Sequence, residues 1–123
     1  MNGWLATSAL LLALGVGLGA FGAHGLRERL DEYSLGVYEK AVFYHFIHAL
    51  GLFLVALLPQ LGLASEGRAN IVSWLLLVGI VLFSGSLYVL AVSGLRWLGA
   101  ITPLGGTAFI FAWVLLAYVL VAK

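Results

Sequence analysis

Three histidines are the side chains of this chain best suited to chemistry, and all three lie in its first half. His24 follows the first apolar run of the sequence, whereas His45 and His48 lie within the second. At about 100° per residue, the two later imidazoles share one side of a helix. Tyr44 precedes His48 by four residues, a spacing at which helical side chains are neighbours. The sequence therefore predicts a polar cluster at His45 and His48, which His24 joins only if the intervening segment folds back.

Three kinds of chemistry fit this cluster. In the first, each imidazole donates a hydrogen bond to a carbonyl or hydroxyl of a neighbouring helix and has only a structural role. In the second, the histidines carry protons or ions, because histidine titrates near neutral pH and ionisable groups within a membrane indicate function. In the third, His45 and His48 bind a metal or haem with a ligand added by His24, a tyrosine or Glu39. The sequence completes no known metal motif, so we predict no cofactor and keep metal or haem binding as an alternative.

The composition places these residues in a membrane. Hydrophobic residues make up 63% of the 123 residues and charged residues only 9%, which is far from a soluble domain. The net charge of +1 offers no basic surface for nucleic acid, and the absence of cysteine removes thiolate metal sites and cysteine nucleophiles. The sequence also has no serine-hydrolase elbow, phosphate-binding loop or dinucleotide-binding motif. We therefore expect a membrane protein that is not an enzyme and does not bind nucleic acid.

Four apolar runs predict four transmembrane helices, since roughly 20 apolar residues cross a hydrocarbon core of about 30 Å. They cover about residues 4–23, 41–58, 71–92 and 103–122. Pro59 ends the second run, and Thr102 with Pro103 gives the fourth an N-cap and a favourable first residue. We expect an all-α membrane protein whose residues 1–123 form a single four-helix bundle.

The segment between the first two runs, residues 24–40, carries seven charged side chains. Its apolar residues recur at spacings of four, three and four, which is typical of an amphipathic helix. These residues are Leu26, Leu30, Tyr33 and Val37. The pattern predicts an interfacial helix that lies on the membrane surface between the first and second spans.

The distribution of Lys and Arg predicts an orientation in the membrane. With four spans, both termini lie on one side, together with Arg68 and Lys123. The other side has four basic residues, which are Arg27, Arg29, Lys40 and Arg96. Because cytoplasmic loops are enriched in Lys and Arg, the count favours both termini outside, and Lys123 is a candidate interface anchor.

Small residues predict how the helices pack, because association in lipid depends on close backbone approach. Glycines of the first span fall at spacings of four, three and three, and leave a groove in which a neighbouring helix can lie. The third and fourth spans begin or continue with further small residues. The predicted packing glycines are Gly15, Gly19, Gly22, Gly25, Gly79, Gly85, Gly105 and Gly106.

Four separated motifs give the chain a family resemblance. They are Gly-Ala-Phe-Gly-Ala-His-Gly-Leu at 19–26, Tyr-His at 44–45 with His-Ala-Leu-Gly at 48–51, Phe-Ser-Gly-Ser-Leu-Tyr at 83–88 and Ile-Thr-Pro-Leu-Gly-Gly at 101–106. Together they resemble the YwdK/YgdD family of small bacterial inner-membrane proteins of unknown function, which has mitochondrial relatives. The resemblance implies four spans, one domain and a multi-pass location in the bacterial inner membrane. It implies no activity, substrate or cofactor.

Two functions of different kinds remain open. The first is a non-enzymatic accessory or assembly subunit that contacts the lipid bilayer and binds other membrane proteins, or a second copy of itself, through its helices. The second is a small oligomeric transporter or channel with a polar face formed by Tyr44, His45, His48, Ser84 and Ser86. We favour the first, because the chain is small, rich in glycine and without a catalytic set.

Overall fold

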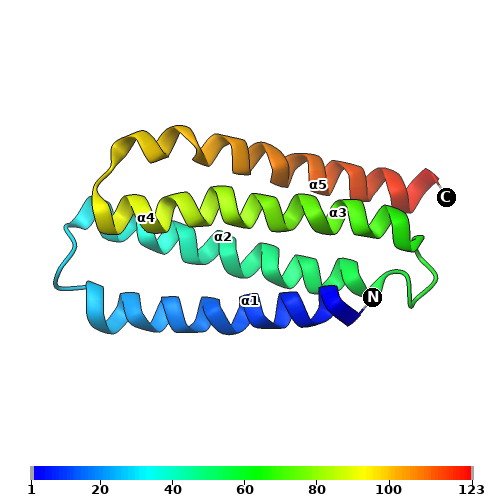
Figure 1. The fold of residues 1–123 in the computed structure, drawn as a ribbon, viewed down its shortest axis with the longest axis horizontal. Coiled ribbons are helices and arrows are strands. Elements are labelled where there is room, and N and C mark those ends of the chain that lie inside the picture. Colours follow the sequence, from blue (N-terminus) through cyan, green and yellow to red (C-terminus); the bar gives the residue numbers. More distant parts are fainter. Residues whose placement is uncertain (1, 123) are drawn as a thin grey trace.

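The computed structural model describes residues 2–122, which form four long helical stretches packed side by side (Figure 1). The elements are α1 (Asn2–Phe21) with the π-helical η1 (Gly22–Leu26), α2 (Glu32–Leu57), α3 (Glu66–Gly79) with the π-helical η2 (Ile80–Gly85) and α4 (Ser86–Ser93), and the 3₁₀ helix η3 (Arg96–Ala100) with α5 (Thr102–Ala122). Each stretch is long and apolar enough to cross a membrane. The predicted all-α, four-span fold is therefore confirmed.

The described helices form a bundle in which α2 is central. It packs against α1 on one side and against α3, η2 and α4 on the other, while α5 packs against α3 and η2. As a result, α1 and α5 lie on opposite sides of the bundle (Figure 1). The start of α1 and the end of α5 lie at the same end, as an even number of spans requires; the predicted anchor Lys123 lies outside the described residues.

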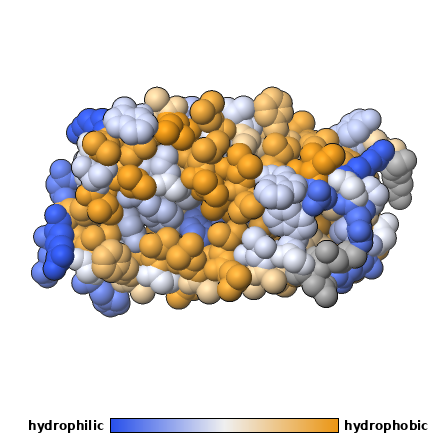
Figure 2. All heavy atoms as spheres, in the orientation of Figure 1, coloured by the Kyte–Doolittle hydropathy of each residue, from blue (hydrophilic) through white to orange (hydrophobic). Residues whose placement is uncertain are grey.

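The surface agrees with a membrane-spanning orientation of the bundle. Figure 2 shows apolar side chains across the middle of the visible face, and hydrophilic side chains gathered at both ends. A hydrocarbon core excludes charge and accepts apolar side chains. The long axis of the bundle is thus the direction that crosses the membrane.

The structure corrects the prediction of a separate interfacial helix over residues 24–40. Residues 22–26 continue the first helix as η1, and α2 already begins at Glu32, nine residues before the predicted span. Three residues of the apolar stripe that suggested a surface helix, Leu26, Leu30 and Val37, join a cluster with Ala91 of α4, while the fourth, Tyr33, is exposed. The pattern is amphipathic because one face of the segment packs against neighbouring helices. Its charged residues are tolerated because this part of the helix extends beyond the hydrocarbon core.

Asp31 sets the start of α2. Its carboxylate accepts a hydrogen bond from the backbone N–H of Ser34 at 2.8 Å, the usual arrangement of an N-cap. This backbone hydrogen bond, together with one from the Ser34 side chain, holds the pKa of Asp31 below its ordinary value of 3.8. The charged form of Asp31 therefore stabilises the beginning of α2.

Glycines permit the closest approach between α5 and the third helical stretch. A Cβ on Gly105 would clash with the backbone nitrogen of Phe83 in η2, and a Cβ on Gly79 would clash with the ring of Phe109. At Gly105 the obstacle is main chain, which cannot turn away as a side chain can. The two helices therefore interlock at two glycines, of which Gly79 faces the ring of Phe109 and Gly105 faces the backbone of Phe83.

The other predicted packing glycines differ in their surroundings. Gly15 and Gly22 lie under α2 side chains, and a Cβ on Gly19 or Gly106 would make ordinary contacts with Val42 or Phe83. A Cβ on Gly25 would meet only Phe21 of the preceding turn, and one on Gly85 would meet nothing within 4 Å. Gly25 and Gly85 therefore do not mediate contact between the described helices.

Candidate functional site

His45 is the centre of the buried polar network of this bundle. Its side chain is 2% exposed, and both ring nitrogens have partners on other helices. Nε2 lies 2.7 Å from the carbonyl of Leu11 in α1, and Nδ1 lies 2.8 Å from the hydroxyl of Tyr88 in α4. A carbonyl only accepts, so Nε2 carries a proton and donates to Leu11. His45 thus joins three helices with both of its nitrogens.

Gly15 makes the Leu11 carbonyl accessible to His45. In an α-helix this carbonyl points toward residue 15 and accepts its N–H. A Cβ on Gly15 would lie 3.1 Å from Cε1 of Phe46 and 3.4 Å from Cδ2 of His45, so it would press on the Phe46 ring and touch the imidazole. The glycine therefore permits close packing and also exposes a carbonyl for a second hydrogen bond.

The same arrangement recurs one heptad along both helices. Tyr38 of α2 donates a hydrogen bond from its hydroxyl to the Leu18 carbonyl of α1, and its ring lies over Gly22. Leu18 is seven residues after Leu11, Gly22 is seven after Gly15, and Tyr38 is seven before His45. We call these two contacts the α1–α2 ties. Gly15 and Gly22 therefore allow a hydrogen bond between the two helices as well as close packing.

Ser84 and Ser86 connect further helices. The Ser84 hydroxyl is fully buried and donates to the Ala41 carbonyl of α2 at 2.7 Å. The Ser86 hydroxyl lies 3.0 Å from the Phe83 carbonyl and 2.6 Å from the hydroxyl of Thr102, at the start of α5. Both serines lie in or next to the π-helical η2, which directs them toward neighbouring helices. Both hydroxyls therefore form hydrogen bonds within the bundle.

The remaining residues of the predicted cluster do not converge with His45. His48 stacks on Phe109 of α5 with ring centroids 3.5 Å apart, and its Nδ1 donates to the Tyr44 carbonyl at 2.9 Å. Tyr44 stacks beside His48 at 5.8 Å, and His24 is exposed on η1. Within residues 2–122, no three histidine or acidic side chains gather in a way that could hold a metal ion.

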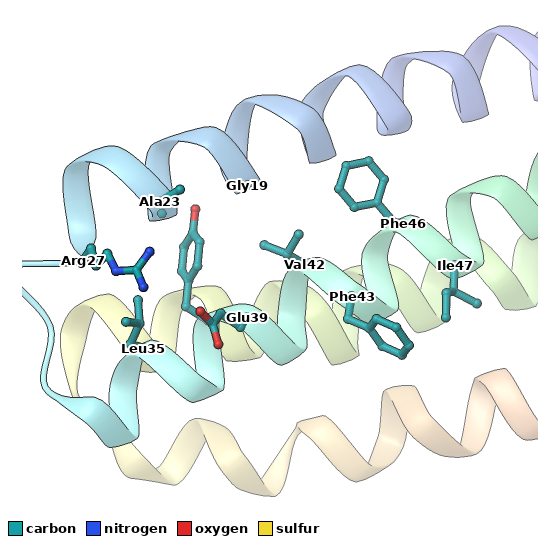
Figure 3. Close-up of a pocket in the computed structure, with 11 residues that line it drawn as sticks. Gly19, Ala23, Arg27, Leu35, Glu39, Val42, Phe43, Phe46 and Ile47 are labelled. Atoms are coloured by element: carbon teal, nitrogen blue, oxygen red, sulfur yellow. The ribbon is translucent and has the colours of Figure 1, made fainter.

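A groove of about 470 Å³ lies beside the α1–α2 ties, on the outside of the bundle (Figure 3). Gly19, together with Val42 and Phe46, lines its apolar part. Figure 3 shows Arg27 and Glu39 at the end nearest the loop between α1 and α2. The predicted glycine groove of the first span is therefore only partly filled by α2, and the rest opens to the surroundings of the bundle.

A second, more polar pocket was missed from the sequence. It has a volume of about 290 Å³, and its polar lining comes from Glu66, Asn70 and Ser73 of α3 and from Trp4 of α1. The three α3 residues recur at spacings of four and three, which places them on one face of a helix. This stripe was the available signal. The stripe escapes a prediction from hydropathy because the third apolar run begins at residue 71, after Glu66 and Asn70.

Four membrane-length helices joined by buried hydrogen bonds define a polytopic α-helical membrane protein. A family model described as "Protein of unknown function (DUF423)" matches residues 18–106, and the chain belongs to this family. The matched residues include all of η2. They also include every residue of the α1–α2 ties apart from Leu11 and Gly15.

Known relatives agree with the family and with the membrane assignment. The UPF0382 membrane protein YwdK of Bacillus subtilis (strain 168) is 49% identical over 116 residues, which cover 94% of each chain. UPF0382 membrane proteins of Staphylococcus saprophyticus and Staphylococcus haemolyticus are 47% and 46% identical, and cover 94% of this chain and 94% and 93% of their own. The resemblance to the YwdK family is thereby confirmed. No solved structure matches the chain.

Proposed function

We propose that this protein is a non-enzymatic accessory or assembly subunit of the bacterial inner membrane, which acts through contacts between its helices and those of a partner. The observation that carries the proposal is the outer face of α1. Six exposed residues recur there at alternating spacings of three and four, and five of them are Gly or Ala. They are Gly3, Ala6, Leu10, Ala13, Gly17 and Ala20, which we call the outer stripe.

The outer stripe points away from the bundle. At about 100° per residue it lies opposite the buried Ser8 and Gly15, which face α2. Apart from the adjacent backbone of α1 itself, no described residue comes within 4 Å of a Cβ on Gly3 or Gly17. Small residues at this heptad spacing allow another helix backbone to approach closely, which is the main source of helix association in lipid.

The inner polar residues support a structural rather than a transporting role. His45 and Ser84 already bind backbone carbonyls of neighbouring helices. Since these hydrogen bonds hold the bundle together, the transporter alternative gains no support from them. The bacterial origin of the relatives supports the inner-membrane location, and the absence of a known catalytic motif supports a non-enzymatic role.

The experiment compares complex size in native membranes. Wild type and Ala13→Leu, produced at chromosomal level, are extracted in mild detergent and sized by native electrophoresis and gel filtration. Ala117→Leu on the exposed face of α5 is the matched control. We expect wild type and Ala117→Leu to migrate in a complex larger than a monomer, and Ala13→Leu to be released from it. A wild type that is always an isolated monomer would refute the proposal.

A further inference from the structure

A polar pocket opens where α1 and α3 begin, at the end of the bundle opposite the groove of Figure 3. Its volume is about 290 Å³. Trp4 lines it from α1, Pro59 from the turn after α2, and Glu66, Asn70 and Ser73 from successive turns of α3. The pocket is far from the ties of His45 and Tyr38, so its polar residues have no part in the network described above.

Ser73 shows that the pocket is suited to a polar ligand. Its side chain is 1% exposed, and its hydroxyl has no hydrogen-bond partner among the described residues. Buried polar atoms in folded proteins are nearly always paired, because an unpaired one loses its hydration without compensation. Ser73 lines the pocket, so a ligand bound there is positioned to give its hydroxyl the partner that it lacks.

A preformed hydrogen bond orients the wall of the pocket. Trp4 donates from Nε1 to Oδ1 of Asn70 at 2.7 Å. The edge-to-face contact of Trp4 with Trp74, at 5.1 Å between centroids and 87° between planes, holds the indole in place. Because Oδ1 of Asn70 accepts from Trp4, the amide NH₂ of Asn70 stays available as a donor. Asn70 and Ser73 therefore offer two donors to an oxygen of the ligand.

Glu66 sets the charge that the pocket prefers. It is the one charged residue among those that line the pocket. A carboxylate attracts a cation, and an indole ring adjacent to it adds a favourable cation–π term. Glu66 and Ser73 are seven residues apart, which is about 10 Å of helix. Asn70 lies between them, so a ligand whose cation pairs with Glu66 and whose oxygen lies a short linker away, near Asn70 and Ser73, fits this spacing.

We propose that this pocket binds an ethanolamine group. Its primary ammonium donates to the Glu66 carboxylate, and the oxygen two carbons away accepts from Asn70 and Ser73. The same group occurs in free ethanolamine and in the headgroup of phosphatidylethanolamine, where that oxygen belongs to a phosphate. A quaternary ammonium has no N–H to donate to Glu66, so choline and phosphatidylcholine fit less well. The outer stripe of α1 takes no part, so this proposal and the proposed function succeed or fail separately.

Thermal unfolding of the full chain in phosphatidylcholine nanodiscs, followed by tryptophan fluorescence, tests the proposal. A ligand that binds only the folded state raises the melting temperature. We expect an upward shift when millimolar ethanolamine is added or when phosphatidylethanolamine replaces part of the lipid, and a smaller one or none with choline. A shift with the lipid alone identifies a headgroup site, and a shift with free ethanolamine identifies a site for the soluble amine. An equal shift with choline, or no shift from either source, would overturn the proposal.

Two variants assign the shift to the pocket. Glu66→Gln should abolish it, and Ser73→Ala, which removes only a hydroxyl, should reduce it while the chain still folds. Glu28→Gln makes the same chemical change on the exposed turn after η1 and should keep the full shift. If Glu66→Gln responds to phosphatidylethanolamine as strongly as wild type does, the lipid acts through the bilayer and the assignment is wrong.

Discussion

The two outermost helices, α1 and α5, meet their surroundings with different side chains. The exposed face of α5 has large apolar residues, among them Ile110 at 65% and Val114 at 62% exposure. The outer stripe of α1 has Gly and Ala at five of its six positions. Large apolar side chains fill the space between a helix and lipid chains, whereas a row of small residues leaves a backbone that another helix can approach. The difference supports our proposal that α1, rather than α5, contacts a partner.

The inner sides of the two helices differ as well. On α1, the α1–α2 ties place a polar side chain over a glycine and a carbonyl. On α5, a glycine allows a close steric fit, as Gly105 does against the backbone of Phe83. The close contacts of α1 with α2 therefore include hydrogen bonds, whereas the closest approach of α5 to the third helical stretch is steric, with one hydrogen bond, between Thr102 and Ser86, at its start.

The largest expected effect comes from adding one methyl group on the α5 side. Gly105→Ala would drive a Cβ into the backbone of Phe83, and we expect a loss of about 3 kcal/mol or a failure to fold, near the upper end of overpacking costs. In Gly106→Ala the new Cβ would lie 3.8 Å from the ring of Phe83, so this variant should leave the stability unchanged or raise it slightly. Reversible unfolding in mixed micelles compares the two. Equal stability of both variants would show that steric fit does not hold α5.

The hydrogen bond between His45 and Tyr88 should contribute less than the steric contact at Gly105 and should depend on both side chains. Removing the imidazole in His45→Ala and the hydroxyl in Tyr88→Phe breaks the same hydrogen bond, so the double variant should lose less than the sum of the single ones. A coupling free energy of about 1 kcal/mol is expected for such a bond in a membrane. A double-mutant cycle on unfolding measures it. Strict additivity would mean that the two side chains do not interact.

At the α1–α3 contact, Ser73→Ala should stabilise the protein in phosphatidylcholine without ethanolamine. The variant removes a buried hydroxyl that has no partner among residues 2–122, so a gain of about 1 kcal/mol is expected. Ser84→Ala is the matched comparison, because its hydroxyl is buried but bound to Ala41, and it should lose stability. Unfolding midpoints of the two variants should therefore move in opposite directions. A loss in both would show that Ser73 has a partner within the fold.

The smallest expected effect is at Asp31, where the chain passes from the first helix to α2. Its pKa is lowered by the backbone N–H of Ser34, so its stabilising contribution is fully present above pH 3.8 and is lost as the pH falls through the lower folded value. Asp31→Asn retains a capping oxygen but does not titrate. The stability of wild type should thus fall more steeply with acid than that of Asp31→Asn. Parallel acid titrations of the two would contradict the N-cap role.

The sequence predicted the features that are local in the chain. Length and hydropathy located the four spans, and Pro59 lies two residues after the end of α2. The start of α2 was placed too late, because charged side chains at 32–40 resembled a surface segment although the helix continues past the hydrocarbon core. Hydropathy reports where lipid ends and does not report where a helix ends.

The candidate site was harder to predict, because its contacts join distant parts of the chain. The hydrogen bonds of His45 fit the structural interpretation of the histidines, but its partner Tyr88 is 43 residues away, and only the rotation of the packed helices selects it. His48 lies on the same side of α2, yet it stacks on Phe109 of α5 and stays out of the His45 network. Helical periodicity gives the face of a side chain and leaves its partner undetermined.

Site-specific photo-crosslinking in native membranes tests most directly that α1, and not α5, faces a protein partner. A leucine analogue with a diazirine replaces Leu10 of the outer stripe or, as the control, Ile110 of α5; both residues are large, apolar and exposed. After irradiation, the account predicts a discrete protein adduct from position 10, and only lipid adducts from position 110. Lipid adducts alone from position 10, or the same protein adduct from both positions, would contradict it.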